Sequence, residues 1–285
     1  MAVYKRGYER YEGPLAPQWS RPLIIARYAY RRVFESRFLM GFLLLCCIYP
    51  AVAAVLIYLP HNAAVAGLFG GKRIMSIDSL FFFRFLSWQG GMAFLLTGFL
   101  GPGLVSPDLV NNALPLYFCR PFSRAEYVIG KMSVLAILIS FITWIPGWVL
   151  VGFESYLDGA AWFAQNWWLL ASLFIGSAVW TVALCLLAMA TSAWVKWRIV
   201  AGALIFALVF VVGGFGQAIN ATLHTQLGSM VNLTEVVGTI WSWLFDRPVE
   251  LKLPIGLAWA SLAAFCGFFY LLLSTKLRAF RVERS

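Results

Sequence analysis

Residues 167–194, WWLLASLFIGSAVWTVALCLLAMATSAW, contain neither a charged side chain nor a proline. The hydrocarbon core of a bilayer is about 30 Å thick, and an α-helix needs about 20 consecutive apolar residues to cross it. This stretch exceeds that length, so it can cross with a tilt or extend past the bilayer. It therefore predicts a transmembrane helix.

The composition of the whole chain supports the same interpretation. It is 61% hydrophobic and only 12% charged, about half the charged fraction of a typical soluble domain. Long apolar runs without clear alternation argue against a barrel, whose strands would alternate over about 10 residues. We predict an all-α integral membrane protein with six transmembrane helices, at 38–59, 81–104, 132–153, 167–194, 197–216 and 254–275.

The basic residues predict the orientation of these helices. With an even number of spans, both termini lie on one side, and that side receives 17 of the 22 Lys and Arg residues. The other side keeps only Lys72, Arg73, Arg84, Arg247 and Lys252. Basic residues are retained in the cytoplasm, so we expect both termini to be cytoplasmic and the protein to lie in the inner (cytoplasmic) membrane. The net charge of +10 then reflects topology and needs no nucleic-acid partner.

The three parts of the chain follow from this topology: a cytoplasmic segment 1–37, the membrane domain 38–275 and a cytoplasmic tail 276–285. The first segment contains a predicted amphipathic helix, with Ser20 as N-cap and Pro22 in the first turn. Arg27, Arg31 and Glu35 recur at four-residue spacing on one face. We expect the helix to lie in the cytoplasmic interface, with its arginines near anionic headgroups. Its apolar stripe is formed by Leu23, Ala26, Tyr30, Val33 and Phe34.

Catalytic and metal-binding patterns are weak in this sequence. His61 and His224 are the only histidines, and we expect neither to lie near a second metal-type residue. The five cysteines lack metal-type spacing. Residues 69–73, FGGKR, resemble the end of a phosphate loop, but the glycine spacing is wrong and Arg73 stands where Ser or Thr is needed. We therefore expect no catalytic or metal site, and any ATP hydrolysis should occur on another chain.

Residues 105–131, between the second and third spans, interrupt the apolar sequence with polar side chains. We expect Pro107 and Asp108 to start a helix, with the acid at its positive end, and Arg120-Pro121 to end it. Ser123 and Glu126 then have the spacing of a capping box for the next helix. A short amphipathic helix held under two spans is suited to docking in a groove of another protein. The candidate docking residues are Asp108, Asn111, Leu114, Leu116, Tyr117, Phe118, Arg120, Pro121 and Arg124.

This run, DLVNNALPLYFCRPFSRAEYVIGK, resembles the signature of ABC type-2 transporter permeases, which are the membrane subunits of ATP-driven exporters. Members typically show an acid, a short helix and a Leu-Tyr-x-x-Arg-Pro-x-(Ser/Thr)-Arg-x-x-Tyr-x-x-Gly-Lys run before a membrane span. The run departs from that pattern at 111–113, Asn-Asn-Ala, where many members have a Gly-Thr or Gly-Ala pair. The matching positions are Asp108, Leu116, Tyr117, Arg120, Pro121, Ser123, Arg124, Tyr127, Gly130 and Lys131.

The resemblance implies a set of partners and a role. Two permease copies, or this chain and a relative, would assemble with two copies of an ABC ATPase. The loop 105–131 would be the coupling helix seated on that ATPase. ATP and Mg²⁺ would bind to the ATPase, and this chain would carry no cofactor and no enzymatic activity of its own.

A second function is open at this point. The outer segments 60–80 and 217–253 are longer than connectors require, and 227–248 contains an amphipathic stretch with Trp241 and Trp243 that we expect on the outer membrane surface. Such surfaces suit a module that transmits ATPase motion to an extracytoplasmic partner protein without moving cargo. The leading hypothesis is export or flipping of a substrate, and this transmission module is the alternative.

Overall fold

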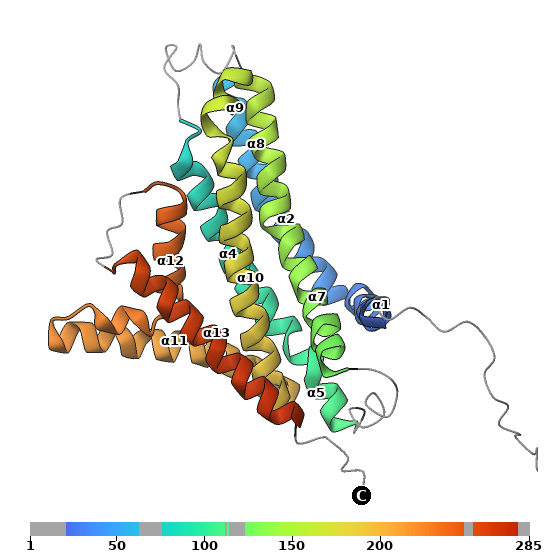
Figure 1. Cartoon of the computed structure of the whole chain (residues 1–285). Coiled ribbons are helices and arrows are strands. Elements are labelled where there is room, and N and C mark those ends of the chain that lie inside the picture. Colours follow the sequence, from blue (N-terminus) through green and yellow to red (C-terminus); the bar gives the residue numbers. More distant parts are fainter. Residues whose placement is uncertain (1–20, 63–75, 112, 114–122, 248–252, 279–285) are drawn as a thin grey trace, which may run out of the picture.

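The computed structural model describes residues 21–62, 76–111, 113, 123–247 and 253–278, and in that part of the chain every regular element is a helix (Figure 1). Six stretches of the described residues are long and apolar enough to cross a membrane, which confirms the predicted class. The elements are α1 (Arg21–Glu35), α2 (Arg37–Tyr58), η2 (Leu59–His61), α4 (Ser79–Leu100), α5 (Pro102–Val110), α7 (Arg124–Ile142), α8 (Trp144–Asp158), α9 (Ala160–Asn166), α10 (Trp168–Trp194), α11 (Arg198–Leu223), η3 (Leu227–Met230), α12 (Leu233–Leu244) and α13 (Ile255–Arg278).

Polar side chains set where several of these helices begin. The Ser36 hydroxyl accepts a hydrogen bond from the Leu39 N–H at the start of α2, and Asp78 accepts from the Leu80 and Phe81 N–H groups at the start of α4. Such caps satisfy backbone donors that have no partner within the helix. The bounds of these helices are therefore encoded locally.

The second and third spans are each built from two helices. α4 continues into α5 through Gly101, whose N–H still donates to the Thr97 carbonyl over 2.8 Å. α7 gives way to α8 at Thr143, because the ring of Pro146 cannot pack against the carbonyl of Ile142 in a continuous helix. Both spans run past their predicted ends, to Ser79–Asp108 and Arg124–Asp158.

Helix α10 lies at the centre of the bundle, in contact with α4, α5, α7, α8, α12 and α13. Two buried indoles tie its middle to neighbouring helices. The Trp180 Nε1–H donates to the Gly90 carbonyl, and the Trp241 Nε1–H donates to the Gly176 carbonyl, each over 2.9 Å. Both glycines are needed there, because a Cβ on Gly90 or Gly176 would press on the Trp241 ring.

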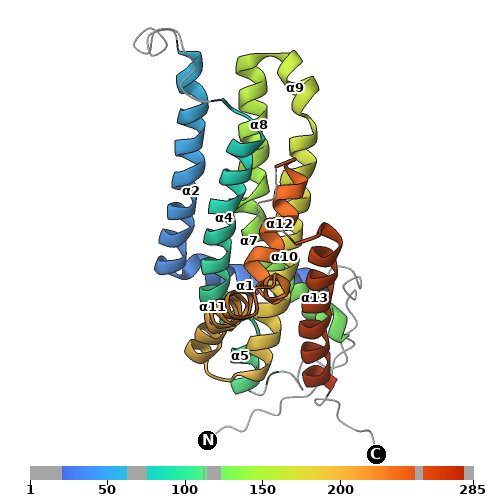
Figure 2. The same ribbon diagram turned by 90° about the vertical axis from the view of Figure 1, so that its left-hand side faces the viewer.

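Helix α11 runs crosswise to the rest of the bundle. In Figure 1 it lies across the view while α7 and α10 run from top to bottom, and Figure 2 looks nearly along its axis. It crosses α4 closely, because a Cβ on Gly202 would stand 2.9 Å from the Gly98 carbonyl oxygen. Small residues permit this kind of close helix crossing in membrane proteins.

Helix α1 confirms the predicted amphipathic helix and packs against α7. Ala26 and Val33 of its stripe are buried, whereas Phe34 remains 53% exposed. The Tyr30 hydroxyl donates to the Ser133 carbonyl over 3.2 Å, and burial raises the pKa of Tyr30 to about 12. The predicted cap Ser20 lies outside the described residues. Much of the apolar stripe thus faces protein.

The amphipathic stretch expected on the outer surface is instead part of the bundle. Helix α12 packs against α13, α10, α11 and α4, and Trp241 is only 6% exposed, although Trp243 is exposed. Its start is fixed by Asn232, which caps Thr234 and is itself buried. The expectation was wrong because the apolar face of α12 covers the central helix.

Candidate functional site

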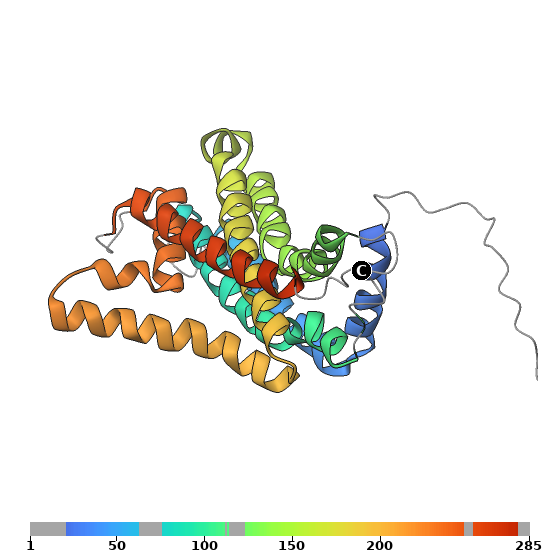
Figure 3. The same ribbon diagram turned by 60° about the horizontal axis from the view of Figure 1, so that its bottom comes forward.

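One end of the helical bundle is formed by α1, α5, the start of α7 and the turn between α10 and α11. We name it the basic end, because Arg124, Lys131, Lys196 and Arg198 lie there. Figure 3 brings this end forward and shows α1 to the right of the bundle, with α11 running from the lower centre to the left. Helix α5 ends and α7 begins at this end, and the predicted docking segment lies between them in the sequence.

Three side chains, Asp108, Tyr127 and Lys131, join the last turn of α5 to the first turns of α7; we name them the Asp108 cluster. The Lys131 ammonium lies 2.9 Å from Asp108 Oδ2, and the Tyr127 hydroxyl donates to the same oxygen over 2.7 Å. The side chains of Lys131 and Asp108 are 9% and 14% exposed, and Tyr127 is fully buried. Charge-assisted bonds of this kind are shorter and stronger than neutral ones.

Local sequence explains how the cluster forms. Tyr127 and Lys131 are four residues apart, so they share one face of α7. That helix is held at its start by a capping box, in which the Ser123 N–H donates to Glu126 Oε2 over 2.6 Å and the Glu126 N–H donates to Ser123 Oγ over 3.1 Å. The predicted capping box is therefore confirmed. It fixes the register that aims Lys131 at Asp108.

The helix position expected for Asp108 is wrong, whereas its docking role stays a prediction. Pro107 and Asp108 do not start a helix: they lie in the last turns of α5, close to its negative end. A carboxylate is unfavourable at that position unless a cation compensates it, and Lys131 supplies the compensation. A sequence signal for this pairing was missed, since a Tyr-x-x-x-Lys pair opens the helix that follows the loop.

The other predicted docking residues are only partly described. Asn111 is exposed just after α5, where its N–H donates to the Pro107 carbonyl over 3.1 Å, and Arg124 is the first residue of α7. The remaining ones lie outside the described residues, namely Leu114, Leu116, Tyr117, Phe118, Arg120 and Pro121.

Helix α5 is also tied to the turn after α10. The Ser106 hydroxyl donates to the carbonyls of Ser192 and Val195, over 3.0 and 2.8 Å. These carbonyls end α10 and have no partner within the helix. Because Ser106 and Asp108 are two residues apart, α5 connects the third span to the turn that leads into α11. A displacement of α5, which belongs to the second span, would therefore also move the third and fourth spans.

At the opposite end of the molecule, His61 Nε2 lies 3.6 Å from Asp158 Oδ1. The expectation that His61 has no metal-type neighbour is therefore wrong. Among the described residues, however, no three His, Cys, Asp or Glu side chains gather in a way that could hold a metal ion. This pair thus brings a histidine of η2 beside a carboxylate at the end of α8.

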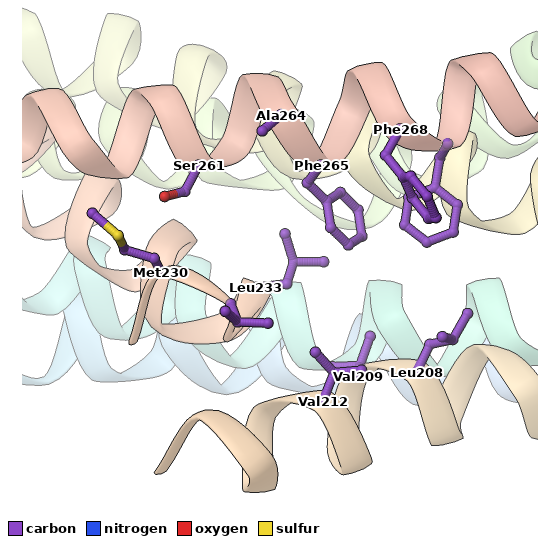
Figure 4. A pocket seen from close by; sticks show the side chains of 11 residues that line it. Leu208, Val209, Val212, Met230, Leu233, Ser261, Ala264, Phe265 and Phe268 are labelled. Carbon is purple, nitrogen blue, oxygen red and sulfur yellow. The ribbon is translucent and has the colours of Figure 1, made fainter. Parts of the chain in front are cut away.

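A cavity of about 380 Å³ lies between α11, α12 and α13. Figure 4 shows valines of α11 facing phenylalanines of α13 across it, with the Ser261 hydroxyl on the α13 side. Among the described residues, no charged side chain lines it, so it can accept an apolar group but provides no ionic anchor. Its lining is Leu208, Val209, Val212, Met230, Val231, Leu233, Ser261, Ala264, Phe265, Phe268 and Phe269.

Compared with known protein families and with curated proteins, the chain matches neither.

Proposed function

We propose that this chain is the permease subunit of an ABC transporter, which couples ATP hydrolysis by a partner ATPase to export or flipping of a substrate. The observation that carries the proposal is the Asp108 cluster. It joins the two helices on either side of segment 111–123, so force applied to that segment acts on the second and third spans together. A flexible linker between two spans would need no such connection.

The sequence resemblance supplies the nature of the partner. In this proposal two ABC ATPase subunits, which bind ATP and Mg²⁺, sit beneath two permease copies or this chain and a related permease. Apolar side chains of the docking segment, Leu116, Tyr117 and Phe118, seat in the ATPase groove, while Arg120 and Arg124 orient it. Closure of the ATPases then moves α5 and α7, and through Ser106 the end of α10.

The distribution of charge supports the orientation. The basic end would face the cytoplasm, because basic residues concentrate there and remain on that side. Both termini and the docking segment would then share the compartment of ATP, and the protein would be a multi-pass protein of the inner membrane.

The packing of α12 favours transport over the transmission module. That alternative was motivated partly by the free outer surface expected of residues 217–253. Because α12 buries Val236, Val237 and Ile240 in the bundle, less of this segment is left to contact an extracytoplasmic partner protein.

The experiment is to replace Tyr117 and Phe118 by alanine and purify the permease from its native membrane. We expect the ATPase to be lost, at a cost of about 2 kcal/mol or more for each true hot spot, while the melting temperature of the permease is unchanged. Tyr156→Ala is the matched control, because this aromatic ring is exposed at the opposite end. Retained ATPase with a lowered melting temperature would instead mean that the segment only packs beneath the spans.

A further inference from the structure

We propose that the groove between the start of α2, the junction of α4 with α5 and the start of α11 binds an anionic phospholipid. Its phosphate would pair with Arg198, and one acyl chain would lie on the aromatic wall beside it. This inference does not depend on the proposed transport function. It uses only the membrane character of the chain and the geometry of the groove.

The groove has the size and the two-part chemistry that such a ligand needs. It has a volume of about 540 Å³, within the range of ligand pockets in proteins, about 300–1,000 Å³. Phe38, Phe99 and Phe206 form its aromatic part, and the Arg198 side chain and Ser36 are its polar part. An amphiphile is the class of molecule that satisfies both parts at once.

The aromatic wall is held by its own packing. The rings of Phe38 and Phe99 meet edge to face at 5.2 Å between centroids, and those of Phe99 and Phe206 do so at 6.3 Å. The Phe206 ring occupies the space that a Cβ on Gly98 would need. The wall is therefore formed before any ligand arrives, which lowers the ordering cost of binding.

Arg198 is the cation that selects an anionic headgroup. The Arg198 guanidinium lies next to Gly103, because a Cβ added to that glycine would be 3.6 Å from the Arg198 Cζ. The Arg198 side chain is exposed. Within the described residues it makes no ion pair. An arginine fork matches a phosphate in a bidentate manner.

The carboxylates of the basic end explain why a lipid is a better occupant than a second copy of the chain. Glu35 pairs with Arg31, Asp108 pairs with Lys131, and Glu126 closes the capping box. Within the described residues, a second copy would therefore bring no free carboxylate of this end to Arg198. A phosphate headgroup brings the missing anion.

The mouth of the groove is continuous with a surface built for lipid. Ile199, which lines the groove, is 87% exposed, and Trp197 and Trp194 nearby are exposed as well. Tryptophan is enriched where the hydrocarbon meets the headgroups. This places the guanidinium of Arg198 at headgroup depth and the aromatic wall beside acyl chains.

The test measures lipid binding to the purified full chain by native mass spectrometry, with phosphatidylglycerol and phosphatidylcholine as competing probes. We expect preferential retention of phosphatidylglycerol by the native protein. Arg198→Gln should weaken that retention roughly ten- to a hundredfold, the loss that follows from removing charge-assisted hydrogen bonds. Arg84→Gln, an exposed arginine on α4 away from the groove, is the matched control and should bind as the native protein does.

A second variant, Ala203→Phe, fills the apolar part of the groove and leaves Arg198 in place. It should weaken long-chain phosphatidylglycerol and spare a short-chain analogue with the same headgroup. Equal retention of both lipids by the native protein, or an unchanged preference in Arg198→Gln, overturns the proposal. A disulfide between copies through Ala203→Cys that forms equally well with and without added phosphatidylglycerol also overturns it, because the occupant is then a second chain.

Discussion

Removing one partner of the Lys131–Asp108 pair should destabilise the protein far more than removing both. At 2.9 Å and an effective dielectric constant of about 20, the attraction between the charges is roughly 6 kcal/mol. Desolvation of both ions offsets much of it, at several kcal/mol per ion, so the net value of the intact pair is small. In Asp108→Leu, however, a 9% exposed ammonium loses its partner, and the expected cost is about 3–5 kcal/mol.

The assay is a double-mutant cycle on the detergent-solubilised protein, followed by thermal unfolding. Asp108→Leu and Lys131→Met should each lower the melting temperature on the order of 5–10 °C, and the double variant should recover most of that loss. Lys196→Met is the control, because this lysine is exposed at the same end and should change stability by no more than about 0.5 kcal/mol. Additive losses in the double variant would refute the reasoning, since they would mean that the two charges do not interact.

Three further predictions concern packing, pH and capping. Gly98→Ala should cost about 1–3 kcal/mol because the new methyl group meets the Phe206 ring, whereas Gly91→Ala on the same helix has open space and should be neutral or stabilising in unfolding experiments. Docking of α1 should be complete below pH 10 and should weaken from about pH 10 to about pH 12, because the raised pKa of Tyr30 makes its ionisation less favourable in the folded state. Amide exchange of α1 measures this weakening, and Tyr30→Phe should remove the pH dependence. Ser123→Ala should cost about 1 kcal/mol in thermal unfolding by removing the cap of α7, and an unchanged melting temperature would contradict that role.

The sequence by itself determined the helices. Long apolar runs, the Pro146 break and the Ser123 capping box are local features, because backbone groups in a bilayer must be satisfied within the helix. They give the number of the spans and the position of the breaks. They also predict α1, whose apolar stripe is visible as a periodicity. The ends of the spans were less well predicted, since apolar composition marks the hydrocarbon core and the helices continue past it.

Tertiary structure decided what the polar residues and the amphipathic helix do. Asp108 pairs with Lys131, which lies on a helix that begins after the loop. No local sequence pattern predicts that Asp108 lies at the C-terminal end of α5. Trp241 is buried because α12 folds back onto α10, a contact between residues far apart in the chain. Arg198, Phe38 and Phe99 line one groove because α11 crosses α4 at Gly98 and Gly202. In a bilayer every backbone polar group of a span must be satisfied within the helix, so an apolar run of sufficient length predicts a helix by itself. The contacts between helices depend instead on side-chain shape across the whole bundle.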